Sequence, residues 1–228
     1  MSDACERIDG HGATRIAEWR DRFPGRVAGS VYAAAPAERV RTARELADAG
    51  LDVHVDLMAS DEGHPAGVGL GELREIAATV QRSRIGVHLI GSPAFVDTAL
   101  PEVLSTRPGR VFLPWHAFTA ERAATVRGVG SAAWIAMWDE WDGIGSTAWP
   151  AQPDGALVML IEPGTSGTCR PSQLAVVSAC ASDMPVHVDG GVTEDVAPLC
   201  LAAGAQSMVV GRALLTPRPV NSTARSTT

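Results

Sequence analysis

Strand-like runs of apolar residues alternate with helical patterns along most of this 228-residue chain. Strands joined by helices must run parallel, and eight of them within about 190 residues favour a closed barrel over an open sheet. The sequence therefore predicts an α/β fold, a (β/α)8 TIM barrel. The expected strands cover residues 26–34, 51–58, 84–90, 110–115, 132–138, 155–161, 185–192 and 206–215.

The start of the chain departs from a regular barrel. Ile16, Trp19 and Phe23 stand at helical spacing, which predicts an extra N-terminal helix over residues 14–23. At the other end, residues 216–228 are rich in Pro, Ser and Thr, so the eighth helix is expected to be short or absent. We expect the N-terminal helix or a second subunit to cover the apolar surface left open.

No linker or change in composition marks a second domain. Residues 1–228 are therefore expected to form a single barrel domain, with flexible tails at 1–12 and 217–228. Residues 139–153 are rich in Trp, Gly and Asp and are expected to form an irregular loop.

Composition excludes several classes of protein. Apolar residues make up 46% of the chain and charged residues 20%, as in packed globular proteins. The net charge is −7 without a basic run, so we expect no nucleic-acid or membrane partner. No secretory signal or membrane-length apolar run is found, and the four cysteines show no Cys-x-x-Cys spacing. These features predict a cytoplasmic protein with reduced thiols.

The second predicted strand, residues 51–58, carries the first candidate chemistry. Its apolar residues alternate with polar ones, so His54 and Asp56 project from one face. An imidazole beside a carboxylate provides half of a divalent-metal site, or a base with its orienting partner. A solvated surface strand would show the same pattern.

Two further strand ends make the metal site more specific. His88 lies near the end of the third strand and Asp189 at the end of the seventh, on the rim where parallel barrels place their active sites. Two imidazoles and two carboxylates suit one divalent ion, and the sequence does not choose among Zn, Fe, Mn and Co.

Loops of small residues follow the late strands on the same rim. Backbone N–H groups there can approach a ligand oxygen closely, and the last two strands of a barrel often end in a phosphate site. Single glycine pairs are also ordinary turn formers. The candidate residues are Gly164, Thr165, Ser166 and Gly167 after the sixth strand, Gly190 and Gly191 after the seventh, and Gly211 and Arg212 at the eighth.

Together these residues resemble ribulose-phosphate 3-epimerase in order and spacing over residues 26–215. The matching segments are His54-Val55-Asp56-Leu57-Met58, His88-Leu89, Val158-Met159, Glu162-Pro163-Gly164 with Gly167, and Val188-Asp189-Gly190-Gly191.

The resemblance implies an isomerase, specifically a sugar-phosphate epimerase. It assigns one divalent metal to His54, Asp56, His88 and Asp189, and the acid and base roles to Asp56 and Asp189. It also implies that Ser30, Met58 and Met159 contact the substrate. Inversion of a carbon beside a carbonyl needs two proton-transfer groups on opposite faces of an enediolate, whose negative charge a metal stabilises.

The chain also departs from the family pattern in its substrate-facing loops. Ile90 replaces a methionine, the Asn-Pro pair expected after the fifth strand is missing, and the loop after the sixth strand carries Thr165 and Thr168 in place of an aromatic residue and a glutamine. Arg212 stands where the phosphate site has a small serine. The substrate is therefore expected to be a ketose phosphate that need not be ribulose 5-phosphate.

Two other functions fit the same residues. One is a metal-assisted aldolase or decarboxylase, which shares an enediolate intermediate, and the other is a non-catalytic barrel that binds a sugar phosphate. In either case the partner is a small sugar phosphate, and we expect a homo-oligomer.

Several remaining side chains have two possible roles. Trp138, Trp141 and Trp149 could stack on a substrate or pack their loop against the barrel. His116 could reach the substrate, whereas His187 is expected to face the helix layer in a structural role.

Overall fold

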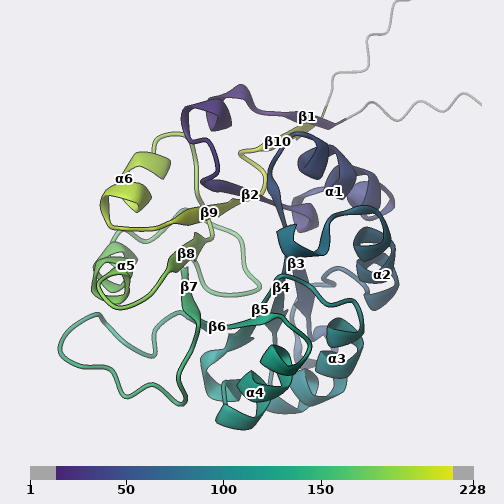
Figure 1. Ribbon diagram of the computed structural model, residues 1–228. Helices are drawn as coiled ribbons and strands as arrows, with labels where there is room; N and C mark the ends of the chain where they lie inside the picture. The colour runs from purple at the N-terminus through teal and green to yellow at the C-terminus, as the bar shows by residue number, and fades with distance from the viewer. Residues whose placement is uncertain (1–13, 218–228) are drawn as a thin grey trace, which may run out of the picture.

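Eight parallel strands close into a barrel in a computed structural model that describes residues 14–217 (Figure 1). Each strand pairs with the next one along the chain, and the last pairs with the first, so the predicted (β/α)8 fold is confirmed. Of the tails expected at 1–12 and 217–228, only Pro217 is among the described residues, and it belongs to a short strand and not to a tail. The barrel strands are β2 (Val27–Ser30), β3 (Asp52–Met58), β4 (Ile85–Ile90), β5 (Arg110–Pro114), β6 (Ala132–Met137), β7 (Gly155–Met159), β8 (Val186–Asp189) and β9 (Ser207–Val210).

Helices surround the strands on the outside of the barrel (Figure 1). Ser92 caps the start of α3 by accepting a hydrogen bond from the Phe95 N–H, and Pro101 lies inside this helix without ending it. Within residues 14–217, no helix combines the length and apolar character needed to cross a membrane. The α-helices are α1 (Arg39–Asp48), α2 (Leu70–Thr79), α3 (Pro93–Ser105), α4 (Ala120–Gly128), α5 (Gln173–Ala181) and α6 (Ala197–Ala202).

Alternation along the strands divides the apolar residues into two cores. The larger one lies between the strands and the helices, where most of the buried Val, Leu and Ile side chains pack. The smaller one fills the barrel interior and consists of Ala28, Phe112, Trp134, Ala136, Leu157, Met159 and Val209. The barrel interior is thus packed with side chains beneath the strand ends and is not a pore.

The helix layer has a gap after β6, where the expected irregular loop is found. Residues 138–154 leave the barrel as a long loop at the lower left of Figure 1. Trp149 packs on Trp115 and Trp141, with ring centroids 5.5 and 6.1 Å apart, and Trp141 and Trp149 both contact the outer core. These two tryptophans therefore pack the loop against the barrel.

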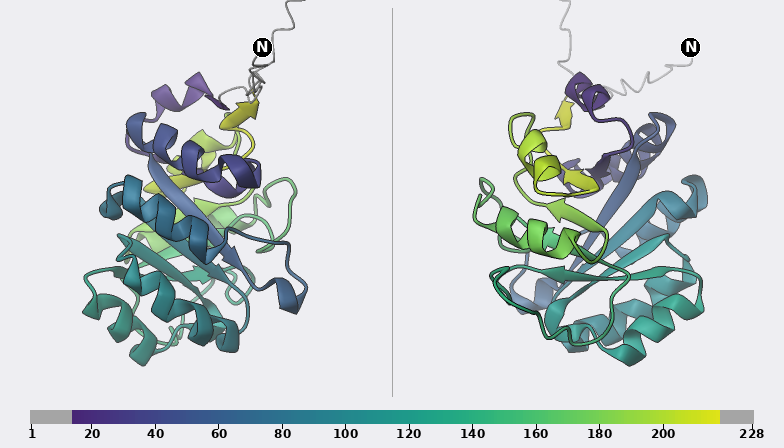
Figure 2. Two further views of the ribbon diagram at one scale, coloured as in Figure 1. Left: turned by 90° about the vertical axis from the view of Figure 1, so that its right-hand side faces the viewer. Right: turned by 60° about the vertical axis from the view of Figure 1, so that its left-hand side comes forward.

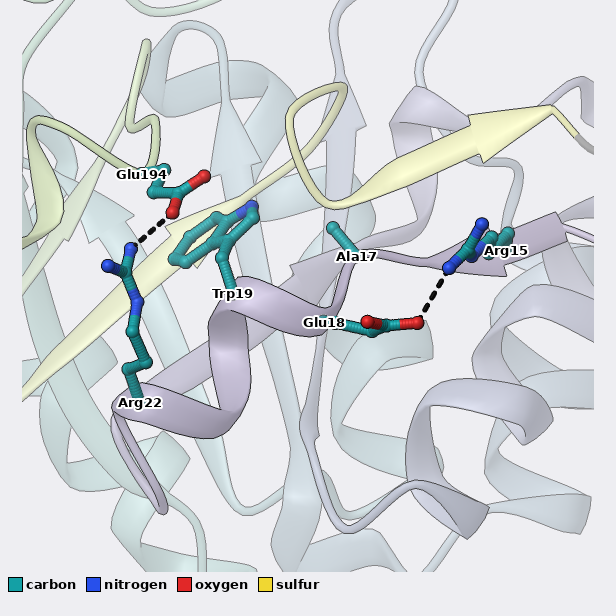
Figure 3. Close-up of a pocket in the computed structure, with 6 residues that line it drawn as sticks. All are labelled: Arg15, Ala17, Glu18, Trp19, Arg22 and Glu194. Carbon is teal, nitrogen blue, oxygen red and sulfur yellow. Dashed lines mark hydrogen bonds and ion pairs between the residues drawn. The ribbon is translucent and has the colours of Figure 1, made fainter.

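A second gap follows β9, because no helix lies between β9 and residue 217. The N-terminal segment covers it, as expected, through η1 (Glu18–Arg22), a short 3-10 helix. Trp19 packs on the outer core, and its Nε1 donates a hydrogen bond to the carbonyl of Ala213, 3.2 Å away. Figure 3 shows Trp19 between the ion pairs Arg15–Glu18 and Arg22–Glu194.

The prediction of one N-terminal helix over residues 14–23 was wrong in its first turn. β1 (Thr14–Ile16) is a strand, paired antiparallel with β10 (Leu215–Pro217), as Figure 1 shows, and both views in Figure 2 place the purple N-terminal segment near the yellow strand β10. A strand partner 200 residues away decided the conformation there, and local spacing does not reveal such a partner. The last predicted strand, 206–215, is likewise divided into β9, a turn and β10.

Candidate metal centre

The four residues predicted to bind a metal converge at the carboxyl ends of β3, β4 and β8. Asp56 and His88 stand directly opposite each other in the register of β3 and β4. Asp189 is the last residue of β8. Figure 1 shows that β8 lies across the barrel from β3 and β4. All four side chains therefore meet over the barrel interior, as the sequence predicted.

The polar atoms of this group lie within reach of a single ion. Nε2 of His54 is 3.0 Å from Oδ1 of Asp56 and 3.6 Å from Oδ2 of Asp189. Nδ1 of His88 is 3.4 Å and 4.0 Å from the same two oxygens. One ligand atom from each of the four residues lies within 4.8 Å of the others.

Neighbouring side chains hold this cluster in place. The Ser30 hydroxyl donates a 2.9 Å hydrogen bond to Oδ2 of Asp56. The Phe112 ring lies beneath both imidazoles, 5.4 Å from the His54 ring and 6.3 Å from the His88 ring between centroids. Gly86 gives the phenyl ring room, since a Cβ there would lie 2.9 Å from it. The imidazoles therefore have few positions open to them.

Electrostatics separates the two carboxyl groups. Burial favours a neutral Asp56, but His54 and His88 outweigh it and hold the pKa of Asp56 below its ordinary value. Burial raises the pKa of Asp189 to about 7; His54 opposes this shift, and the charge of Asp56 adds to it. Two carboxyls with separated pKa values are a frequent arrangement in acid–base catalysis.

The imidazoles respond to the same neighbours. Burial lowers the pKa of His54, but Asp56 and Asp189 raise it by more, so the net shift is upward. For His88 burial dominates, and the pKa is lowered. A neutral His88 keeps a lone pair available, which metal binding requires.

A divalent cation fits this donor set. Nδ1 of His88 is buried, and its 3.4 Å approach to Oδ1 of Asp56 lacks the geometry of a hydrogen bond, so it has no such partner among residues 14–217. An unpaired buried atom of this kind is costly unless it has a ligand. Asp189 is half-buried, and no guanidinium among the described residues forms an ion pair with it, so a cation would favour its ionised form. Two nitrogen and two carboxylate donors suit Zn, Fe, Mn or Co.

A cavity of about 820 Å³ opens above the cluster. Asp56 and Asp189 stand in its wall, and the loops after β2, β7, β8 and β9 surround it. Every residue predicted to bind substrate lines this cavity: Ser30, Met58, Met159, Gly164, Thr165, Ser166, Gly167, Gly190, Gly191, Gly211 and Arg212.

The glycine pair after β8 gives this wall its shape. Gly190 and Gly191 have φ angles of +105° and +65°, which L side chains rarely adopt. A Cβ on Gly190 would lie 2.4 Å from Ile161, and one on Gly191 would lie 2.5 Å from the backbone nitrogen of Cys169. Only glycine allows the backbone after β8 to approach the loop after β7 this closely.

The expectation for His187 was wrong. Its ring lies 4.5 Å from Trp134 and 6.0 Å from Phe112 between centroids, so it points into the barrel interior and not toward the helices. It shares this inward face with Asp189, two residues on, which the strand period requires. Burial, followed by the charges of Arg110 and His54, lowers the pKa of His187 to about 3, so it forms a neutral layer below the metal cluster.

Other candidate side chains lie outside the cavity. His116 is exposed, and its Nε2 is 3.2 Å from the Gly91 carbonyl oxygen. Trp138 packs on the inner core under the Arg170 guanidinium, which lies 4.4 Å from the ring centroid. Neither residue lines the cavity.

Sequence reasoning missed Tyr32 and Thr193, which also line the cavity. Each stands two residues beyond a residue that was predicted, Ser30 and Gly191, so the position after a strand end was the available signal. A second cavity, of about 540 Å³, lies on the surface around Trp19 (Figure 3). Its acidic residues Glu18 and Glu194 are already paired with Arg15 and Arg22.

Comparison with known sequences agrees with this geometry. The profile described as the ribulose-phosphate 3 epimerase family matches residues 26–215, which is most of the chain. The chain belongs to the ribulose-phosphate 3 epimerase family. Membership supports a barrel enzyme that acts on a sugar phosphate. No curated protein sequence matches the chain.

Solved structures support the fold. Phosphoribosyl anthranilate isomerase from Thermus thermophilus is 15% identical, with a TM-score of 0.56 over 82% of this chain and 88% of that one. The same enzyme from Thermococcus kodakaraensis is 14% identical, with a TM-score of 0.55 over 83% and 89%. Orotidine 5'-phosphate decarboxylase from Pyrococcus horikoshii is 14% identical, with a TM-score of 0.52 over 82% and 89%. At these identities the likeness concerns the barrel alone.

Proposed function

We propose that this family member is a metal-dependent epimerase that inverts the carbon next to the carbonyl of a ketose phosphate. The observation that carries the proposal is the meeting of Asp56 and Asp189. They lie 133 positions apart in the sequence, yet one imidazole, His54, lies within 3.6 Å of both carboxylates. Both also line one cavity.

The two acids have separate tasks in this reaction. One carboxylate removes the proton from the carbon beside the carbonyl, and the other, in its protonated form, returns a proton to the opposite face. Ser30 donates to Asp56 and fixes the orientation of that carboxylate. Asp189 has no such donor from a side chain among the described residues, and the Gly190 backbone holds it.

His54, Asp56, His88 and Asp189 would hold the metal. When bound, a divalent cation supplies Lewis-acid stabilisation of negative charge on the substrate oxygens. The apolar side chains of Met58, Ile90 and Met159 stand beside the acids in the cavity wall. They exclude water without offering a competing proton donor.

A Schiff-base mechanism is excluded by composition. All 19 basic residues of the sequence are arginines, and it contains no lysine. An aldolase that forms an imine with its substrate requires a lysine amine. An aldolase or decarboxylase on this barrel would therefore have to stabilise its intermediate without a lysine imine.

Solvent-proton exchange tests the proposal. The metal content of the purified protein is measured, and a panel of pentulose, hexulose and heptulose phosphates is incubated with it in D₂O. We expect deuterium at the carbon beside the carbonyl, an epimeric product with all its carbons, and about one metal ion per chain. A shortened product would favour the aldolase or decarboxylase.

Two variants and a control assign the exchange to the acids. Asp56→Asn and Asp189→Asn should each reduce exchange by at least about 1,000-fold, because a carboxamide cannot accept or return the proton. Asp48→Asn, an exposed residue at the end of α1, should exchange normally. Undiminished exchange in both site variants would reject the proposal.

A further inference from the structure

The cavity above the metal cluster contains an uneven set of charges. Three acidic side chains line it, Asp56, Asp189 and Glu162. Among residues 14–217, Arg212 is the only basic residue in the lining. An anionic ligand that enters this cavity therefore meets one guanidinium and several carboxylates.

Arg212 is also available for binding. Its side chain makes no ion pair or hydrogen bond with any residue between 14 and 217, and it is exposed. Other arginines near the strand ends are engaged: Arg122 binds Asp97, and Arg170 covers Trp138. An unpaired guanidinium at the rim of a cavity offers up to five donors in a fixed fork.

The backbone before Arg212 is held close to the barrel. A Cβ on Gly211 would lie 3.2 Å from the Ala33 Cβ and 4.0 Å from the Ser30 Cβ, so β9 ends in direct contact with the loop after β2. Leu214 and Leu215 donate backbone hydrogen bonds to the Gly211 carbonyl. The backbone that carries Arg212 is therefore fixed, so only its side chain has to be ordered when it binds a ligand.

We infer that Arg212 is a specificity-determining residue that binds the phosphate of the substrate through its guanidinium, opposite the glycine-rich backbone after β7 and β8. The inference rests on the proposed function for the identity of the substrate. A planar fork matches two phosphate oxygens at once. Since no second basic side chain among the described residues lines the cavity, loss of Arg212 leaves the rim of the cavity without a cationic side chain for the phosphate.

Binding of inorganic phosphate tests this inference without any catalysis. Phosphate binding to the metal-loaded protein is measured by calorimetry at constant ionic strength, for the wild type, Arg212→Gln, Arg212→Lys and the control Arg82→Gln. Arg82 is an exposed residue outside the cavity. We expect Arg212→Gln to weaken phosphate binding by about 10- to 100-fold, Arg212→Lys to weaken it less, and Arg82→Gln to leave it unchanged.

Kinetics provides a second measurement. With the ketose phosphate that exchanges fastest, Arg212→Gln should raise KM by a similar factor and change kcat little, because the phosphate is held equally in ground and transition states. The same ketose without its phosphate should be insensitive to the substitution.

The two proposals fail separately. If no ketose phosphate exchanges, the epimerase is rejected, and the phosphate titration still decides the role of Arg212. If the wild type binds no phosphate, or if Arg212→Gln binds it as tightly as the wild type, the inference about Arg212 is overturned even when exchange is normal.

Discussion

The floor and the rim of the cavity are built in different ways. The floor consists of His54, Asp56 and His88, which stand on strands and are buried. The two imidazoles pack on the Phe112 ring. The rim consists of loops with exposed side chains, held by a few hydrogen bonds and by glycines at positive φ. The difference indicates that the reaction depends on the rigid part of the barrel and the choice of substrate on the adaptable part.

The largest effect on stability and metal binding is expected at Phe112, beneath the floor. Phe112→Ala removes a ring that is 1% exposed and supports both imidazoles. We expect a loss of about 3–5 kcal/mol of folding free energy, measured by urea denaturation, together with weaker metal binding.

Phe118→Ala, an equally buried change in the outer core, is the control. It should destabilise similarly without changing the metal affinity of the folded protein. If both variants keep wild-type metal affinity, the floor does not depend on this ring.

An intermediate effect is expected where two rim loops touch. Gly164 has a φ of +77°, and a Cβ there would lie 2.7 Å from Nδ1 of His64 in the loop after β3. Gly164→Ala should cost about 1–2 kcal/mol through backbone strain and this contact. Adding His64→Ala should recover the part due to the contact, which a double-mutant cycle measures. An additive cycle would show that the two loops are independent.

The smallest effect is a dependence on pH at the rim. Glu62 accepts hydrogen bonds from the hydroxyl and the backbone N–H of Ser92, and these bonds hold the pKa of Glu62 below its ordinary value of 4.5. A lowered pKa in the folded state stabilises the protein above pH 4.5, and this stabilisation is lost as the pH falls through the lowered value. The unfolding free energies of the wild type and Glu62→Gln, compared across this range, should show the wild type losing more stability toward acid. Parallel curves would contradict the assignment.

The floor could be predicted from the sequence because strand periodicity carries the information. His54 and Asp56 share a face by their spacing, and their meeting with His88 and Asp189 follows once the strands are parallel and in register. The same rule predicts that His187 shares the face of Asp189. The expectation that it faces the helices was wrong because that period was not applied to it.

The rim and the covering of the barrel were harder to predict. Trp149 packs on Trp115 and not on a ligand because of the path that its loop follows. That loop has no periodic pattern, so the sequence does not predict its path. The N-terminal turn was predicted as a helix because Ile16 and Trp19 have helical spacing, whereas the edge of β10 pairs with it from the far end of the chain.

The junction between the two ends of the chain has a consequence for synthesis. β2 finds its second partner only in β9, and β1 finds its partner only in β10. A nascent chain that emerges from the ribosome therefore carries two open strand edges until its final segment is free, and such edges invite association with other chains. A truncation after β8 would remove β9 and β10 and leave the edges of β1 and β2 without partners, so we expect its product to be prone to aggregation.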